Sequence, residues 1–196
     1  MPLPLYAHSQ DGQPASTWEP LETHLNCVAE KAFEFTAKFG AGEWGRAAGL
    51  LHDIGKLALD HCRHGLFVSL MQVAHVQHVR YHVIEAEVMP IGHAQIGASQ
   101  AQRWNLPPTL CESIAYHHTP RAATLSPKLT AAVALANEIA HFLEDTPSGE
   151  APVTLEDLLA SCRESMLPLR IRPEALEGIV LTCRSEMEQS LSALAF

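Results

Sequence analysis

The residues with the clearest chemical potential are His52 and Asp53, a histidine followed directly by an aspartate. An imidazole nitrogen and a carboxylate oxygen are both good ligands for transition metals. The pair follows a stretch of small apolar residues, 47–51, which predicts a buried helix, and Gly55 is expected to end that helix. Lys56 then lies beside the pair, where its ammonium could neutralise a phosphate. The pattern therefore predicts a metal site next to a phosphate site.

Other residues with ligand chemistry occupy the apolar faces or the ends of further expected helices. His24 lies next to an apolar stripe, His93 would open a helix, and Asn137 lies among alanines and valines. Each has an ordinary explanation, because a buried histidine or amide usually finds a hydrogen-bond partner and a terminal histidine interacts with the helix dipole. The ordered set is a stronger signal than any single member. The candidate metal ligands are His24, His52, Asp53, His93, His117, His118 and Asn137.

A further group of histidines precedes His93 in the sequence. Three of its five members share one face of an expected helix, and the other two lie nearby. They are His75, His78 and His82, with His61 and His64. We interpret this group as a solvated polar face, and the alternative that stays open is a role at the metal site. Glu85 and Glu87 are expected to lie behind the ligands or to face solvent, and not to be ligands themselves.

Helical elements must position these residues, since helical periodicity dominates and no run of alternating strands is visible. We expect one all-α domain, a helical bundle of about seven to nine helices. The expected helices span about 17–40, 44–53, 66–89, 93–104, 107–118, 126–143, 154 onward (opened by a capping box at 154–157) and 173 onward. The expected divisions are an N-terminal extension at 1–16, a metal-binding helical core at 17–143, a loop at 144–153 and C-terminal helices at 154–196 that pack on the same domain.

The composition argues against several classes of protein. No apolar run is long enough for a membrane span and no secretory signal is visible, so we expect a cytoplasmic protein. Five scattered cysteines without a Cys-x-x-Cys pair indicate reduced thiols rather than disulfides or a structural zinc site. The net charge of −9 disfavours a dedicated nucleic-acid binder. Twelve histidines against thirteen lysines and arginines point to metal chemistry or pH-sensitive chemistry.

These motifs and their flanking residues resemble the HD superfamily of metal-dependent phosphohydrolases, which is named for its His-Asp pair. Residues 92–98, 103–107, 115–120 and 135–140 are most similar to the HDOD branch, which occurs in bacterial signalling and regulatory proteins. The N-terminal part, residues 6–56, instead resembles the HD nuclease domain of CRISPR interference proteins. The two branches share the order of the ligands, so both imply a metal site, but they imply different substrates.

The resemblance implies a cofactor of one or two divalent transition-metal ions, which could be iron, manganese, nickel, cobalt or zinc. Three residues would hold a first ion, with Asn137 as a weak or water-mediated fourth partner: His24, His52 and Asp53. Three histidines would hold a second ion, with the Asp53 carboxylate bridging the two: His93, His117 and His118. Such a site supplies hydroxide near neutral pH, with Asp53 and Lys56 as the catalytic residues.

Three functions remain open at this point. The first is a metal-dependent phosphohydrolase that cleaves a phosphomonoester or phosphodiester of a nucleotide-like molecule, with a signalling or regulatory role. The second is a non-catalytic HDOD-like signalling or binding module, which Asn137 favours because catalytic HD enzymes usually carry aspartate at this position. The third is an HD nuclease that acts on single-stranded nucleic acid. The expected partner is a phosphate-containing small molecule or nucleotide rather than a membrane, and the last helix could form a homodimer.

Overall fold

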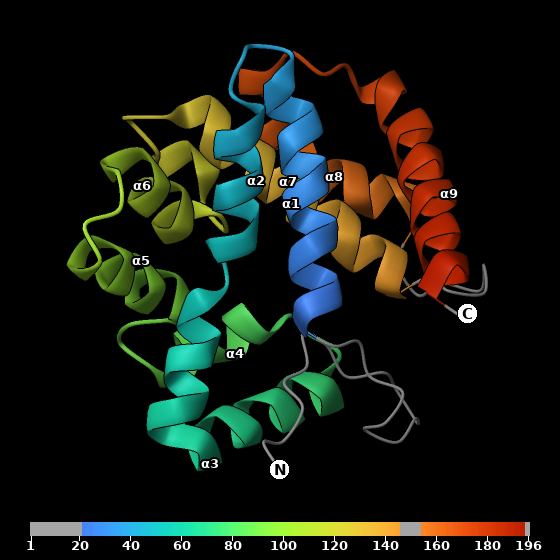
Figure 1. The fold of residues 1–196 in the computed structure, drawn as a ribbon. Helices are drawn as coiled ribbons and strands as arrows, with labels where there is room; N and C mark the ends of the chain where they lie inside the picture. The colour runs from blue at the N-terminus through green and yellow to red at the C-terminus, as the bar shows by residue number, and fades with distance from the viewer. Residues whose placement is uncertain (1–20, 146–153, 195–196) are drawn as a thin grey trace.

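The structure is a computed structural model that describes residues 21–145 and 154–194, and over these residues it is built from α-helices without a strand (Figure 1). The all-α prediction is confirmed. The described residues form nine α-helices: α1 Leu21–Ala37, α2 Gly42–Leu51, α3 Ile54–Gln77, α4 Tyr81–Val88, α5 His93–Arg103, α6 Pro108–Tyr116, α7 Pro127–Asp145, α8 Leu155–Leu169 and α9 Leu176–Leu194. Two short 3-10 turns, η2 Pro120–Ala122 and η3 Pro173–Ala175, precede α7 and α9.

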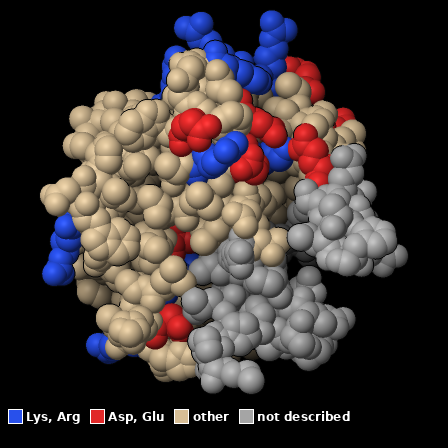
Figure 2. All heavy atoms as spheres, in the orientation of Figure 1, with Lys and Arg blue, Asp and Glu red and all other residues tan. Residues whose placement is uncertain are grey.

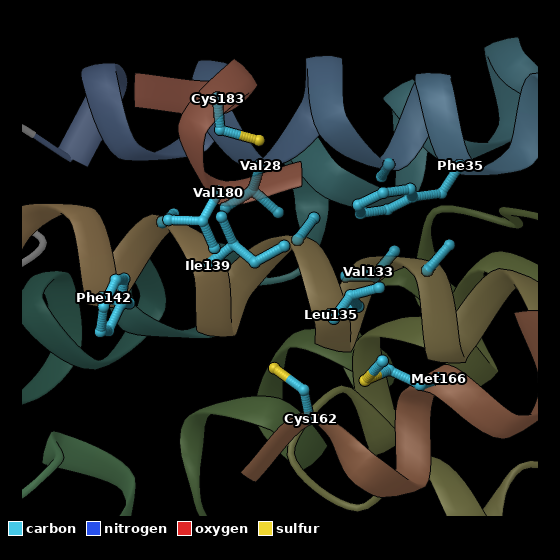
Figure 3. Close-up of a cluster of buried hydrophobic side chains, with 14 of the residues drawn as sticks. Val28, Phe35, Val133, Leu135, Ile139, Phe142, Cys162, Met166, Val180 and Cys183 are labelled. Atoms are coloured by element: carbon cyan, nitrogen blue, oxygen red, sulfur yellow. The ribbon is translucent and has the colours of Figure 1, made fainter. Parts of the chain in front are cut away.

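Helix α7 lies at the centre of the main core and packs against α1, α2, α6, α8 and α9. Residues 129–137 of this helix are all buried, which is typical of a helix that neighbours surround on every side. Figure 3 shows side chains of α7 between those of α1 and α9 on one side and those of α8 on the other. The labelled residues include Val133, Leu135 and Ile139 of α7, Val28 of α1, Met166 of α8 and Val180 of α9.

Helices α1 and α2 approach each other closely because the residues of α2 at the crossing are glycines, which have no side chain to keep the backbones apart. A Cβ atom added at Gly49 would lie 2.5 Å from the Cα atom of Ala29, and one added at Gly45 would lie 2.3 Å from the carbonyl oxygen of Ala32. This packing brings the end of α2 against the first turns of α1. As a result, the rings of His24 and His52 lie 5.5 Å apart between centroids.

Gly55 has a different role from the one predicted. It does not end a helix, because α2 ends at Leu51 and Gly55 is the second residue of α3. Its role is steric: a Cβ atom at this position would lie 1.9 Å from the carbonyl oxygen of His93 and 2.8 Å from the backbone nitrogen of Gly97. Gly55 therefore lets α3 and α5 touch along their backbones, and this contact brings His93 next to the His-Asp pair.

The helix predicted at 66–89 is in fact interrupted. Helix α3 ends at Gln77, and His78 adopts a left-handed conformation with a φ of 53° that caps it. Helix α4 then starts at Tyr81 and ends at Val88. Apolar residues keep helical spacing across the break, so periodicity alone predicts one continuous helix. Helix α3 also starts earlier than predicted and is kinked at Arg63, which has φ −143° and ψ 46°.

The ends of the expected divisions are only partly visible. The extension at 1–16 and the start of the first helix near Thr17 lie outside the described residues, and the loop predicted at 144–153 begins later, because α7 continues to Asp145. The capping box is confirmed, since Thr154 and Asp157 each accept a hydrogen bond from the other's backbone N–H. The division into these segments stays a prediction.

No helix in the described part of the chain is both long and apolar enough to cross a membrane. The cytoplasmic location and the homodimer stay predictions.

Candidate metal centre

The structure brings all the candidate ligands together although they come from five regions of the chain. His24 lies in α1, the His-Asp pair in the turn between α2 and α3, and His93 opens α5. The paired histidines follow the end of α6, and Asn137 lies in the middle of α7. All are buried except the partly exposed His118. A set this rich in polar groups inside a core requires partners that compensate its burial.

The Asp53 carboxylate lies between two groups of histidines. Its Oδ2 atom lies 3.4 Å from His52 Nε2 and 4.0 Å from His24 Nε2. Its Oδ1 atom lies 3.1 Å from His93 Nε2 and 3.7 Å from His117 Nε2. We call His24, His52 and Asp53 the first group, and Asp53, His93, His117 and His118 the second group; within each, one ligand atom per residue lies within 4.8 Å of the others. This is the grouping that the resemblance implies, and the role of these residues as ligands stays a prediction.

Backbone contacts orient two of the histidine rings toward the centre. His52 Nδ1 lies 2.7 Å from the carbonyl oxygen of Gly49, and His117 Nδ1 lies 2.8 Å from that of Ile114. A carbonyl oxygen only accepts, so Nδ1 carries the hydrogen and Nε2 of the neutral ring keeps a lone pair. Both Nε2 atoms, like Oδ1 of Asp53, are buried and have no hydrogen-bond partner among the described residues.

These buried acceptor atoms fit a divalent transition metal. An unsatisfied buried polar atom costs about 1–3 kcal/mol, and an ion would satisfy several of them at once. Two ligands that each lie about 2.1 Å from one ion are separated by about 3.0–3.4 Å. His52 Nε2 lies 3.4 Å from one Asp53 oxygen, and His93 Nε2 lies 3.1 Å from the other. Imidazole and carboxylate ligands together suit iron, manganese, cobalt, nickel or zinc.

Helix α7 contributes an amide and an additional histidine on the side of His24. Asn137 Oδ1 lies 3.1 Å from His24 Nε2, and both residues are buried. His141 lies one turn further along α7, and its ring centroid is 5.0 Å from that of His24. The sequence interpretation did not include His141. Its spacing of four residues from Asn137, which places both on one helical face, is the signal that could have identified it.

Lys56 is buried inside the centre and is not a solvated cation. Its ammonium donates a hydrogen bond of 2.7 Å to Asp53 Oδ2 and lies 5.6 Å from the ring centroid of Tyr81. Only 4% of the residue is exposed. Lys56 therefore lies beside the His-Asp pair, as predicted. In this structure its ammonium pairs with the Asp53 carboxylate, whereas the sequence predicted a phosphate as its partner.

The protonation states of the centre favour metal binding at neutral pH. Burial on its own would raise the pKa of Asp53, but the Lys56 ammonium and His52 hold this pKa well below its ordinary value. Burial lowers the pKa of His52 to about 4, and it lowers the pKa values of His117 and His118 well below their ordinary range. Metals bind ionised carboxylates and neutral imidazoles, so Asp53, His52, His117 and His118 need not lose protons first.

We expect the metal-free protein to lose stability as the pH falls from about 6.5 toward 4. A histidine whose pKa is lower in the folded state leaves the unfolded chain with more bound protons in this window, so the free energy of unfolding decreases. His52 alone, with a folded pKa of about 4 against an ordinary 6.5, accounts for a loss of about 2 kcal/mol between pH 7 and pH 5.

His93 acts in the opposite direction: burial lowers its pKa, but the neighbouring carboxylates of Asp53 and Glu85 raise it by more. His117 and His118, whose pKa values are lowered, outweigh this single opposing residue. Urea denaturation of chelator-treated protein at pH 7, 6 and 5 measures the effect. A free energy of unfolding that stays constant from pH 7 to pH 5 contradicts the prediction.

Two residues of α4 also reach the centre. Glu85 Oε2 lies 2.7 Å from His93 Nδ1, which agrees with the expected place of this acid behind the ligands. His82 stacks on His118 with ring centroids 3.9 Å apart, so its assignment to a solvated polar face is wrong. The other four histidines of that segment belong to neither ligand group: His61, His64, His75 and His78. His82 could have been separated from them only by knowing that the helix breaks at His78.

A cavity of about 690 Å³ lies at the opposite end of α1 and α2 from the centre. Phe39, Trp44 and Leu125 contribute apolar walls, and Lys128 contributes the cation. None of the candidate ligands lines this cavity. The residues for which the sequence predicts metal chemistry therefore lie in the buried centre and not around this cavity.

The fold and the centre together define a helical domain of the HD type, with its candidate ligands collected from separate helices around one His-Asp pair. The HDOD domain family matches residues 18–120, which is just over half of the chain. The chain therefore belongs to the HDOD domain family. The predicted membership of the HD superfamily and its HDOD branch is confirmed, whereas the resemblance to CRISPR-associated nuclease domains stays a prediction.

Individual proteins are also similar to this chain. An uncharacterised protein of Treponema pallidum (strain Nichols) is 34% identical over 109 residues, which cover 55% of this chain and 21% of that protein. A candidate signal-transduction protein from Marinobacter aquaeolei VT8 has a TM-score of 0.72 at 17% identity, over 95% of this chain and 41% of that one.

Two further solved structures are similar to this chain. A candidate phosphohydrolase from Shewanella amazonensis SB2B has a TM-score of 0.63 at 20% identity, over 93% of this chain and 66% of that one. An HDOD domain protein of unknown function from Geobacter sulfurreducens has a TM-score of 0.64 at 19% identity, over 85% of this chain and 60% of that one. At these identities the structures show the fold alone. The chain spans about a fifth of the curated relative and less than two thirds of each of the three structures.

Proposed function

We propose that this chain is a metal-dependent phosphohydrolase domain with a signalling or regulatory role. The observation that carries the proposal is the set of buried, unsatisfied ligand atoms around one carboxylate: Nε2 of His52, Nε2 of His117 and Oδ1 of Asp53. Burial of such atoms is costly unless another group satisfies them, and a divalent ion would satisfy them together. The names of two similar structures, a candidate phosphohydrolase and a candidate signal-transduction protein, support the same class.

The residues of the centre have distinct tasks in this proposal. Asp53 joins the two groups through its two oxygens, and Lys56 keeps that carboxylate ionised and oriented through its hydrogen bond of 2.7 Å. A bound divalent ion would lower the pKa of a water ligand and stabilise charge on phosphoryl oxygens. His118 is the partly exposed member of the second group, so a phosphate ester would approach from its side.

The proposed substrate is a phosphomonoester or phosphodiester of a small molecule or nucleotide. The net charge of −9 disfavours long nucleic acids, because binding to them depends on cations that neutralise phosphates. Acidic side chains lie directly below the basic ones at the upper end of the face in Figure 2. Ion pairs such as Arg46 with Glu30 further reduce the cationic groups that are available to phosphates.

Elemental analysis of protein purified without chelator, followed by hydrolysis assays, tests the proposal. We expect one or two transition-metal ions per chain, and cleavage of p-nitrophenyl phosphate or bis(p-nitrophenyl) phosphate that chelator abolishes and added metal restores. Protein that binds no metal after incubation with manganese, iron, cobalt, nickel or zinc contradicts the proposal. Degradation of single-stranded DNA that His52→Ala abolishes would favour the nuclease function instead.

A non-catalytic metal-binding module is a second candidate, and Asn137 is the observation that favours it. Its neutral amide lies 3.1 Å from His24 Nε2, in the place where a carboxylate would add charge to the first group. An amide oxygen is a weaker partner for a divalent ion than a carboxylate is. The first group can therefore bind an ion less tightly than a site with an additional acid.

Asn137→Asp distinguishes these two candidates. We expect the variant to bind the ion of the first group at least about tenfold more tightly, because a second negative charge is added beside the ligands. Phosphoester hydrolysis is expected to increase as well, and Asn137→Ala is the control that removes the amide without adding charge. Metal titration by calorimetry and the same hydrolysis assays measure both effects. Tighter binding without hydrolysis in either protein would favour the non-catalytic module, and unchanged affinity would contradict the place of Asn137 at the site.

A further inference from the structure

Helix α4 contributes no candidate ligand, yet three of its side chains contact the second group. The ring centroid of Tyr81 lies 5.8 Å from that of His93, and the ring of His82 stacks on His118. Glu85 makes the polar contact, with its Oε2 atom 2.7 Å from His93 Nδ1. The question is what this buried acid does for the centre.

Glu85 occupies a place that fits its carboxylate closely. The residue is only 2% exposed, and its ion pair among the described residues is with His93 rather than with a lysine or arginine. A Cβ atom added at Gly92 would lie 2.6 Å from Glu85 Oε2, so the absence of a side chain at Gly92 makes room for the acid. A buried carboxylate is costly unless a specific contact compensates it, and here the contact is the His93 ring.

The Glu85 contact decides which ring nitrogen of His93 faces the centre. A carboxylate accepts the hydrogen bond, so Nδ1 carries the hydrogen and Nε2 of the neutral ring offers its lone pair. That Nε2 atom lies 3.1 Å from Asp53 Oδ1 and 3.1 Å from His118 Nε2. A carboxylate behind a ligating histidine fixes the ring orientation and makes the opposite nitrogen a better ligand.

The first group is oriented by other contacts. His52 donates from Nδ1 to the carbonyl oxygen of Gly49 within α2. His24 lies against the Asn137 amide and the His141 ring, which both belong to α7. These contacts come from α2 and α7 rather than from α4, so the two groups depend on different parts of the fold.

We propose that Glu85 is the positioning residue of the second group and determines how tightly this group binds its ion. The inference rests on the proposed metal-dependent function. It adds that the two groups bind their ions with affinities that depend on different residues. Loss of the Glu85 charge lowers the affinity of the second group for its ion and leaves the affinity of the first group unchanged. Glu85 acts through His93.

Glu85→Gln, compared with Glu87→Gln, tests this separation. The first variant keeps the size of the side chain and removes its charge, and the control makes the same change at an exposed acid of the same helix. Calorimetric titration of the full chain with Mn²⁺ and with Zn²⁺ measures the number and affinity of bound ions. We expect Glu85→Gln to lower the affinity for one ion by about 10- to 100-fold. The affinity for the other ion, and both affinities in the Glu87→Gln control, are expected to stay unchanged.

Two further measurements keep the inference testable if the titration curves overlap. Gly92→Ala is expected to weaken the same ion, because the added methyl group displaces the Glu85 carboxylate without changing any charge. Nitrogen-15 NMR of the histidine rings in metal-free protein is expected to show His93 protonated at Nδ1 in the wild type, and a changed tautomer population in Glu85→Gln.

The outcomes separate this inference from the proposed function. Wild-type affinity for every bound ion in Glu85→Gln overturns the inference and leaves the proposed function standing. Equal weakening of two ions also overturns it, because the two groups would then not be separate. A wild-type chain that binds no Mn²⁺, Zn²⁺ or other transition metal overturns the proposed function, and the inference with it.

Discussion

Asp53→Asn is expected to abolish metal binding by both groups, and phosphoester hydrolysis with it. One carboxylate oxygen faces each group, at 3.4 Å from His52 Nε2 and 3.1 Å from His93 Nε2, so a single change removes the shared charge. We expect the affinity for each ion to fall by at least about 100-fold, since even the loss of a residue behind a ligand costs about 10- to 100-fold. No other substitution in the centre is expected to affect both ions to the same extent.

The same variant is expected to be less stable even without metal. Lys56 donates to Asp53 Oδ2 and is buried, so asparagine leaves its ammonium without the carboxylate that compensates it. Removal of one partner from a buried ion pair costs about 3 kcal/mol or more. Urea denaturation of chelator-treated protein measures this loss, and Asp53→Asn combined with Lys56→Met is expected to recover part of it.

Asp60→Asn is the matched control for both measurements. Asp60 lies one turn after Lys56 in α3, is only half-buried, and pairs with the exposed His64. We expect this control to keep the metal content and to change stability by less than about 1 kcal/mol. If Asp53→Asn retains two ions at wild-type affinity, Asp53 is not the shared ligand.

Gly55→Ala is expected to destabilise the fold by about 1–3 kcal/mol or more and to disrupt the centre. The added Cβ atom would lie 1.9 Å from the carbonyl oxygen of His93 and 2.7 Å from its carbonyl carbon. These are backbone atoms, so rotation of a side chain cannot relieve the overlap, and α3 and α5 must separate. Because His93 is the first residue of α5, its ring would move away from Asp53.

Gly65→Ala in the same helix is the control, and its effect on the free energy of unfolding is expected to have the opposite sign. Nothing lies within 4 Å of a Cβ atom added at Gly65, which is exposed. Alanine is favoured over glycine in a helix by about 0.5–1 kcal/mol, so this variant should be slightly more stable than the wild type. Urea denaturation measures both variants. A Gly55→Ala protein as stable as Gly65→Ala would show that α3 and α5 do not touch at Gly55.

Much of the candidate site could be predicted from local patterns. His24 and Asn137 lie on faces with apolar spacing, so their burial follows from helical periodicity. The capping box at Thr154 depends on residues three positions apart and was predicted correctly. The break at His78 could not be predicted in this way, because the apolar spacing continues through it while its left-handed conformation interrupts the helix.

The sequence by itself determined the types and the order of the candidate ligands, because the ability of imidazole and carboxylate groups to bind metals follows from residue type and helical spacing is local. The tertiary structure alone decided how they meet: that Gly55 permits the contact of α3 with α5, that Lys56 is turned onto Asp53, and that Glu85 lies behind His93. The physical reason is that the placement of a helix such as α4 or α5 depends on backbone contacts and burial between distant segments, which leave no periodic signal. His52 and Asp53 could therefore be singled out as candidate ligands from their types, whereas which histidines face each oxygen of the Asp53 carboxylate could be assigned only from the tertiary structure.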